Sequence, residues 1–277
     1  MRKRFILSAA VLALTLCLAG PSWAEGELAI TGTDGGWTYE GEVLTITKGG
    51  AYEIAMTPGT TITAHSVYVN PDVKADITLR DVHIDTRRAA VDAGAFRVAE
   101  DSVVNLTLAG KNALRSGGHY AGLGVLLAEL TIGGEGSLDA VGGDGGEGIS
   151  ANHSTLRITG GEVAAFGGAG DGGGDYNSGG AAGIGGENEA LIIITGGAVH
   201  SEGNGNAPGI GGRQNAWITI EGGSVTAVGG ENGGRALEGR VEIKATAYEY
   251  LTDDNDERAF PPDPFVNGDY VYVQIDV

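Results

Sequence analysis

The sequence is poor in cysteine, proline and aromatic residues. Its 277 residues include one cysteine, Cys17, seven prolines and 6% phenylalanine, tryptophan and tyrosine. Because Cys17 lies in a segment that we expect to be cleaved off, the mature chain would have no disulfide, no thiolate metal site and no cysteine nucleophile. The few prolines and the lack of a Gly-X-Y period exclude a collagen-like triple helix.

Lysine and arginine are also scarce. The chain has 17 of them against 36 aspartates and glutamates, which gives a formal net charge of −19. A surface this acidic repels nucleic acid and anionic lipid, so we expect neither as a partner. The acidity is typical of a soluble exported protein, and it also suits a protein that binds divalent cations, with calcium the plentiful candidate outside the cell.

No apolar run is long enough to span a bilayer comfortably. The longest, Phe5–Leu18, follows the basic residues of positions 2–4 and precedes Ser22-Trp23-Ala24, whose small residues suit a signal peptidase. We therefore predict a signal peptide over residues 1–24, cleaved near Ala24. The mature chain would be secreted, periplasmic or held at the cell surface, with no membrane span. Its oligomeric state is left open.

Glycine, in contrast, is abundant. The chain has 51 glycines, roughly one residue in five where average proteins have about 7%. Each glycine costs about 1 kcal/mol in the interior of a helix, so this composition argues against a mostly helical protein. A hydrophobic content of 42% argues against a disordered chain. The composition therefore indicates a β protein with frequent glycine turns.

A repeat begins near residue 130. Each copy has a short β-rich run, a Gly-Gly turn, a second run, a glycine-rich loop and a Gly-Ile-Gly or related sequence. The clearest copies start at Leu156 (LRITGGEV), Ile192 (IIITGGAV) and Trp217 (WITIEGGSV). The last apolar residue of the first run recurs every 23 to 36 residues, and the series extends upstream: Leu79, Leu108, Ile132, Ile158, Ile194, Ile220 and Ile243.

This rhythm predicts an all-β protein, a single right-handed parallel β-helix of about seven to eight coils, because a propeller blade needs about 40 residues or more. Alternate strand residues such as Leu156 and Ile158 would point inward, and Arg157, Ile193 and Thr219 would point outward. Glycines would form the corners, where φ is positive or where a side chain would collide with the next coil about 4.8 Å away.

Both ends of a solenoid need caps, because the last coils otherwise expose apolar edges. We assign residues 25–60 to an N-terminal cap containing a hairpin over residues 37–46. Residues 245–277 would form a C-terminal cap that ends in the alternating strand from Tyr270. Residues 25–277 would thus form one domain.

The sequence Ile-Thr-Gly-Gly-x-Val followed by Ala-Gly-Ile-Gly-Gly resembles glycine-rich repeat proteins exported by bacteria. These are similar to a surface β-helix family of calcium-dependent carbohydrate-binding domains, whose shape is like that of polysaccharide lyases. The resemblance covers residues 28–244, with 76–84 resembling the family's opening coil, and it implies a β-helix that binds carbohydrate. That family often has Asp-Gly-Ile in its third strand, where acidic groups can serve calcium. Here the equivalent triplets begin with Glu147, Ala182 and Pro208, so one carboxylate remains.

Two loops offer oxygen ligands to calcium. Asp144 and Glu147 lie in a segment that fits the calcium nonapeptide of β-helix repeats if Glu147 replaces its aspartate. Asp171, Asp175 and Asn177 lie in the longest coil and provide carboxylate and amide oxygens. The alternative for this second loop is a flexible, solvated insertion.

Sugar binding needs exposed aromatic rings and polar groups. Tyr120, Tyr176 and Trp217 are the aromatic candidates within the array, and Arg213 follows a Gly-Gly corner from which it could face a groove. Packing under a loop is the alternative for Trp217, and a surface ion pair is the alternative for Arg213. The five histidines have no metal-type spacing.

These patterns favour a non-catalytic protein that binds a polysaccharide or glycan or interacts at the cell surface, with calcium as a possible cofactor. A polysaccharide lyase or hydrolase is a second reading. Arg213 would be the base of such a lyase, although no spacing singles out a pair of catalytic carboxylates. A structural or adhesive repeat protein with a protein partner is a third reading, which the sequence does not separate from the first.

Overall fold

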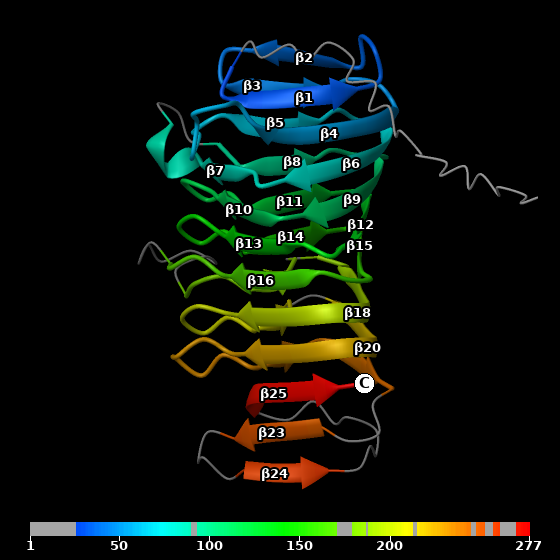
Figure 1. Ribbon diagram of the computed structural model, residues 1–277. Helices are drawn as coiled ribbons and strands as arrows, with labels where there is room; N and C mark the ends of the chain where they lie inside the picture. Colours follow the sequence, from blue (N-terminus) through cyan, green and yellow to red (C-terminus); the bar gives the residue numbers. More distant parts are fainter. Residues whose placement is uncertain are drawn as a thin grey trace, which may run out of the picture.

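The computed structural model describes residues 26–89, 93–170, 179–186, 188–212, 215–244, 248–252, 257–260 and 270–277. Within them the chain is almost entirely β structure, with one short 3-10 helix, η1 (Thr86–Arg88). The chain winds into a parallel β-solenoid of about seven turns, and the coils stack in the order of the sequence (Figure 1). The predicted all-β solenoid is confirmed.

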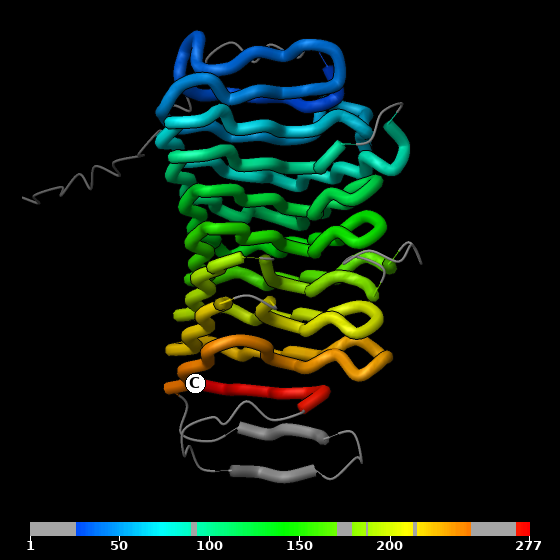
Figure 2. Tube along the Cα trace, turned by 180° about the vertical axis from the view of Figure 1, so that it is seen from behind, coloured from blue at the N-terminus to red at the C-terminus, as the bar shows by residue number. Residues whose placement is uncertain are grey.

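Most coils contribute one strand to a nine-stranded sheet, sheet B, and two to a 16-stranded sheet, sheet A. Sheet B contains β2(Trp37–Glu40), β3(Val43–Ile46), β5(Ser66–Val69), β8(Phe96–Val98), β11(Leu123–Leu126), β14(Ile149–Asn152), β17(Ile184–Gly185), β19(Ile210–Gly211) and β21(Leu237–Glu238). The stacked coils can be followed from behind in Figure 2.

Sheet A has two legs, which meet in two long strands, β18(Leu191–Glu202) and β20(Trp217–Val228). The first leg contains β1(Leu28–Gly32), β4(Gly50–Met56), β6(Lys74–Arg80), β9(Val103–Ala109), β12(Glu129–Gly134), β15(Thr155–Ile158) and β22(Arg240–Ile243). The second leg contains β7(His83–Asp85), β10(Lys111–Arg115), β13(Ser137–Val141), β16(Glu162–Phe166) and β25(Tyr270–Asp276), with β23(Tyr248–Thr252) and β24(Glu257–Phe260) beyond β25.

The first-leg register confirms the repeat from residue 132 onward and corrects it upstream. Ile132, Ile158, Ile194, Ile220 and Ile243 pair in one row, each with the next. Above Ile132 that row continues through Leu106 and Ile77. The predicted Leu108 and Leu79 pair with each other two residues further along their strands. Because side chains alternate with a period of two, a shift of two residues still points an apolar residue inward. The alternation in the sequence therefore does not reveal a register error of two residues.

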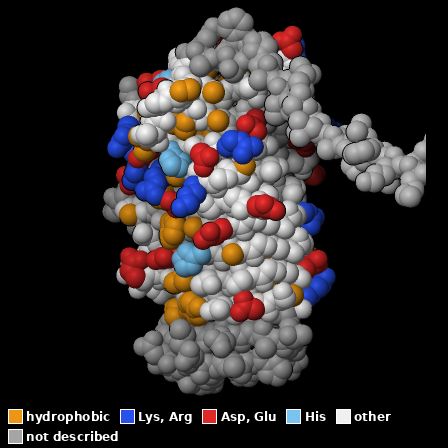
Figure 3. Space-filling model, viewed as in Figure 1, with side chains coloured by type: hydrophobic (Ala, Val, Ile, Leu, Met, Phe, Trp, Pro, Cys, Tyr) orange, Lys and Arg blue, Asp and Glu red, His pale blue; other side chains and the backbone are white. Residues whose placement is uncertain are grey.

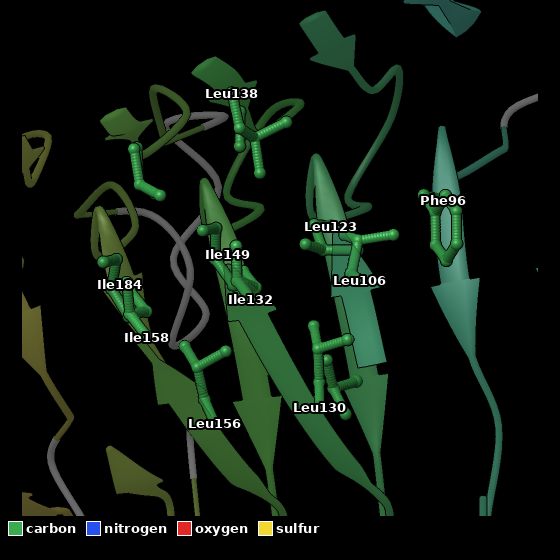
Figure 4. Packing of buried hydrophobic residues seen from close by; sticks show 14 of the residues in the cluster. Phe96, Leu106, Leu123, Leu130, Ile132, Leu138, Ile149, Leu156, Ile158 and Ile184 are labelled. Atoms are coloured by element: carbon green, nitrogen blue, oxygen red, sulfur yellow. The ribbon is translucent and has the colours of Figure 1, made fainter. Parts of the chain in front are cut away.

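The core consists of apolar rows enclosed by three walls, which are sheet B and the two legs of sheet A. Leu156 and Ile158 are fully buried, whereas Arg157, Ile193 and Thr219 are partly exposed, as the alternation predicts. Figure 4 shows apolar side chains from sheet B, such as Phe96, Leu123, Ile149 and Ile184, beside Leu106, Ile132 and Ile158 of the first leg. Burial of these rows is the main favourable contribution to the stability of the solenoid.

Two different constraints select glycine in the repeat. Gly197, the second glycine of a Gly-Gly turn, has φ +87°, in the left-handed region that favours glycine. Gly148, which begins a Gly-Ile sequence, has no such φ. A Cβ there would lie 2.5 Å from the Phe166 nitrogen, 2.7 Å from the Gly183 oxygen and 2.9 Å from the Ala140 oxygen. Turn geometry and close stacking of coils therefore each account for part of the glycine content.

Antiparallel pairs lie at both ends of the stack. At the first end, β2 and β3 form the hairpin expected over residues 37–46, and β1 pairs antiparallel with β4. At the other end, β25 pairs antiparallel with the last part of β20 and with β23. No helix of the described residues is both long and apolar enough to cross a membrane.

Candidate functional site

A hollow of about 260 Å³ opens on the outer face of sheet B. Tyr68, Arg97, Gly124 and Ser150 are successive neighbours in one outward row, so the hollow forms where Gly124 lacks a side chain. A Cβ at Gly124 would meet nothing nearer than the Arg97 Cγ at 3.8 Å, an ordinary contact. The neighbouring coils therefore do not require glycine here, unlike at Gly148.

The guanidinium of Arg97 contacts two tyrosine rings beside this hollow. Its central carbon lies 5.3 Å from the ring centre of Tyr68 and 5.7 Å from that of Tyr120, within the range of cation–π attraction. The alternation of Phe96, Arg97 and Val98 directs Arg97 outward. Gly94 leaves room for it, because a Cβ there would lie 3.0 Å from the Arg97 side chain. Among the described residues, no carboxylate forms an ion pair with Arg97.

The rest of the lining is polar. Glu100, Glu147, Ser150 and Asn152 provide oxygen atoms around the hollow, and the Asn152 Oδ1 is buried without a hydrogen-bond partner in the described structure. His119 also lines it, and its Nδ1 lies 2.6 Å from the Asp144 carbonyl oxygen, to which it donates when protonated. The lining thus combines ring faces, fixed N–H donors and carboxylate acceptors, the groups that recognise sugar C–H faces and hydroxyls.

The structure brings part of the predicted site together. Tyr120, which is 37% exposed, and Glu147 line the same hollow, and Asp144 is linked to its edge through His119. Trp217 lies apart on the first leg of sheet A and is 50% exposed, with the Arg240 guanidinium 4.3 Å from its ring centre. The remaining candidates lie outside the described residues: Asp171, Asp175, Tyr176, Asn177 and Arg213.

Calcium binding stays a prediction. The part of the chain that the structure describes contains no group of three or more histidine, cysteine, aspartate or glutamate side chains able to hold a metal ion. Asp144 is exposed and Glu147 is partly exposed. The loop with most of the predicted oxygen ligands, residues 171–177, is among those not described.

The sequence reading missed Arg97 and Tyr68. Each stands between two inward apolar residues, Phe96 and Val98 for Arg97, and Val67 and Val69 for Tyr68, so both could be recognised as outward. Their adjacency depends on the pairing of β5 with β8. The upstream coils lack the Gly-Ile-Gly signature that reveals register in the later ones.

The fold and this lining define the protein as a parallel β-solenoid with an open, tyrosine-flanked hollow on one wall. No family model, no curated protein and no solved structure matches the chain.

Proposed function

We propose that the protein is an exported, non-catalytic carbohydrate-binding protein that holds a sugar unit of a glycan over Gly124. The observation that carries this proposal is the missing side chain at Gly124 in an outward row that otherwise presents Tyr68, Arg97 and Ser150. The volume of about 260 Å³ is slightly below the usual range of small-ligand pockets. It suits one or two sugar units of a longer chain.

The chemistry of the lining supports this ligand class. Tyr120 offers ring surface to the C–H face of a sugar, and its contact with Arg97 limits the motion of both side chains. The Arg97 N–H groups can donate to hydroxyl oxygens, and the carboxylates of Glu100 and Glu147 can accept from hydroxyl groups. Calcium at the predicted oxygen ligands would assist by neutralising carboxylates, in keeping with the acidic composition.

A structural or adhesive role with a protein partner is a second candidate. It is supported by apolar side chains on the outer surface of sheet A. Leu191 and Ile193 are partly exposed, and Trp217, the neighbour of Leu191 in the stack, is half exposed. Exposed apolar residues that lie together are typical of contact surfaces between proteins.

The proposal is tested with Gly124→Leu, which places a bulky side chain in the hollow. A glycan array probed with the wild-type protein, with calcium and with chelator, identifies a ligand, and calorimetry then measures its affinity. We expect Gly124→Leu to weaken binding at least about tenfold, because it removes both ring contact and hydrogen bonds, together worth about 1.4 kcal/mol or more. The matched control is Ala164→Leu, an outward position of β16 on the other sheet.

Three outcomes would contradict the proposal. The first is that the wild-type protein retains no glycan in either condition. The second is equal affinity for wild type and Gly124→Leu. The third is release of soluble oligosaccharides from the bound glycan, which would instead support the lyase or hydrolase reading.

A further inference from the structure

Charge is unevenly distributed along the solenoid. Residues 74–115 contain seven basic and six acidic residues, whereas residues 116–277 contain six basic and 23 acidic residues. Because the coils stack in sequence order, the near-neutral early coils of residues 74–115 lie along the long axis between acidic first coils and acidic later coils. The first coils, residues 26–73, contain one basic and six acidic residues.

Three arginines gather on the second leg of sheet A within these early coils. Arg87 and Arg88 belong to η1, which projects from the wall of the solenoid (Figure 1), and Arg115 ends β10. Their side chains are 52%, 64% and 39% exposed. We call these residues the arginine cluster. In Figure 3 a group of Lys and Arg side chains lies on this side of the molecule.

A buried carboxylate organises the cluster. Asp85 is 6% exposed, and its two oxygens accept from Arg87 Nε and Nη2 at 2.8 and 2.7 Å. These hydrogen bonds hold the pKa of Asp85 below its ordinary value. The Arg88 Nε lies 3.9 Å from the same Asp85 oxygen, so two guanidiniums converge on one atom. Arg115 is the neighbour of Asp85 in the stack.

Some guanidinium donors are left for a ligand. Arg87 uses Nε and Nη2 on Asp85, and Arg115 uses Nη2 on Asp139. The Arg88 contact at 3.9 Å is too long for a hydrogen bond, so with respect to the described residues its planar fork of donors is available. Such a fork matches the oxygens of a phosphate or carboxylate. Within the described residues, the three guanidiniums form ion pairs with two carboxylates, Asp85 and Asp139, and Asp85 lies beneath them.

The surroundings limit the size of an anionic ligand. On the same leg, the outward carboxylates of Asp139, Glu162 and Glu202 follow in later coils. A long polyanion or a flat anionic membrane lying along this leg would meet these charges and be repelled. A compact anion would contact the arginine cluster alone.

We propose that the arginine cluster is a second binding site, separate from the hollow on sheet B, which takes a compact phosphate monoester. The ester phosphate would lie between Arg87 and Arg88, and Arg115 would lie beside it. His83 of β7 lies two residues before Asp85, and its Nε2 is 3.0 Å from the Lys111 carbonyl oxygen, while the carboxylate of Asp81 accepts from the Lys111 backbone N–H. The site does not depend on glycan binding.

Arg88→Gln is the discriminating variant. Arg87 neutralises a buried carboxylate, so changing it would also disturb folding, whereas among the described residues Arg88 makes only a long contact. Isothermal titration uses methyl phosphate, a monoester without a sugar ring for the hollow to bind, and, separately, inorganic phosphate at low salt. We expect saturable binding of one equivalent, weakened about tenfold or more in Arg88→Gln, since a charge-assisted hydrogen bond is lost. Arg88→Lys, which keeps the charge and loses the fork, should lie between the two.

One control variant locates the site. Arg80→Gln removes an arginine of the first leg that is paired with Glu53 at 3.0 Å, and it should bind methyl phosphate as the wild type does. Absence of saturable phosphate binding, an unchanged affinity in Arg88→Gln, or loss of binding in Arg80→Gln would each overturn the proposal. Co-sedimentation with anionic phospholipid vesicles, lost in Arg88→Gln, would overturn the restriction to compact ligands.

Discussion

Gly148→Ala tests whether close stacking of coils fixes the Gly-Ile sequence. The added Cβ would lie 2.5, 2.7 and 2.9 Å from three backbone atoms, which belong to Phe166, Gly183 and Ala140. Real Cβ atoms essentially never approach other atoms within 3.0 Å. Because all three neighbours are backbone, no side-chain rotation relieves the contact, and the strands themselves must move.

The expected cost follows from this geometry. Inserting one carbon into a well-packed region costs about 1–3 kcal/mol, and three simultaneous backbone contacts place Gly148→Ala at the upper end, about 3 kcal/mol. This is a large part of a total stability of about 5–15 kcal/mol. For a domain of this size it corresponds to a fall in Tm of about 6–12 °C.

Gly124→Ala is the matched control, because it makes the same change in the neighbouring coil of sheet B where the nearest contact is 3.8 Å. Urea and thermal unfolding followed by far-UV circular dichroism, with hydrogen exchange to detect opening of single coils, measure both variants. Gly124→Ala should remain within about 0.5 kcal/mol of the wild type, as for a surface change. Equal stability of the two variants would refute the close-stacking explanation.

Two further predictions concern buried polar groups, Asn112 and Asp85. Asn112 is 3% exposed, accepts from the Val82 N–H at 3.0 Å and donates to the Ser137 oxygen at 3.1 Å. Asn112→Ala should therefore lower the free energy of unfolding in urea by about 2–4 kcal/mol. A loss within about 0.5 kcal/mol would contradict this. The folded-state pKa of Asp85 is lowered by its hydrogen bonds from Arg87. The ionised carboxylate therefore contributes about 1–2 kcal/mol to the free energy of unfolding. This contribution is complete above the unfolded pKa of about 3.9 and is lost as the pH falls through the lower folded pKa. The difference in Tm between wild type and Asp85→Asn should therefore shrink below about pH 4, and a difference that does not vary with pH would disprove the assignment.

The fold could be predicted because its signals are local and repeated. The spacing from Ile132 to Ile243 gave the correct register, since each copy carries the same turn beside the same apolar residue. Upstream, where those turns are missing, the spacing predicts Leu108 in the row that Leu106 occupies. Two inward residues of one strand are equivalent in a period-two pattern, and the strand partner decides between them.

The candidate site was only partly predictable. Their chemistry predicts Tyr120 and Glu147 as site residues, and both line the hollow, whereas Arg97 and Tyr68 lie in coils whose register the sequence does not determine. Trp217, predicted on the same grounds, lies on another wall. The type of a residue indicates whether its side chain can bind a ligand. Whether several such side chains form one site depends on which coils are neighbours.

The sequence by itself determined the solenoid, its alternation of inward and outward residues, and the need for glycine, because these depend on period, propensity and backbone sterics. The tertiary structure decided what the outer surface can do. It placed a missing side chain at Gly124 beside the stacked Arg97, and it converged Arg87 and Arg88 on the buried Asp85. The first juxtaposition depends on contacts between residues of different coils, which exist only once the chain is wound. The second depends on the short helix η1, which turns Arg87 and Arg88 back toward its N-cap Asp85.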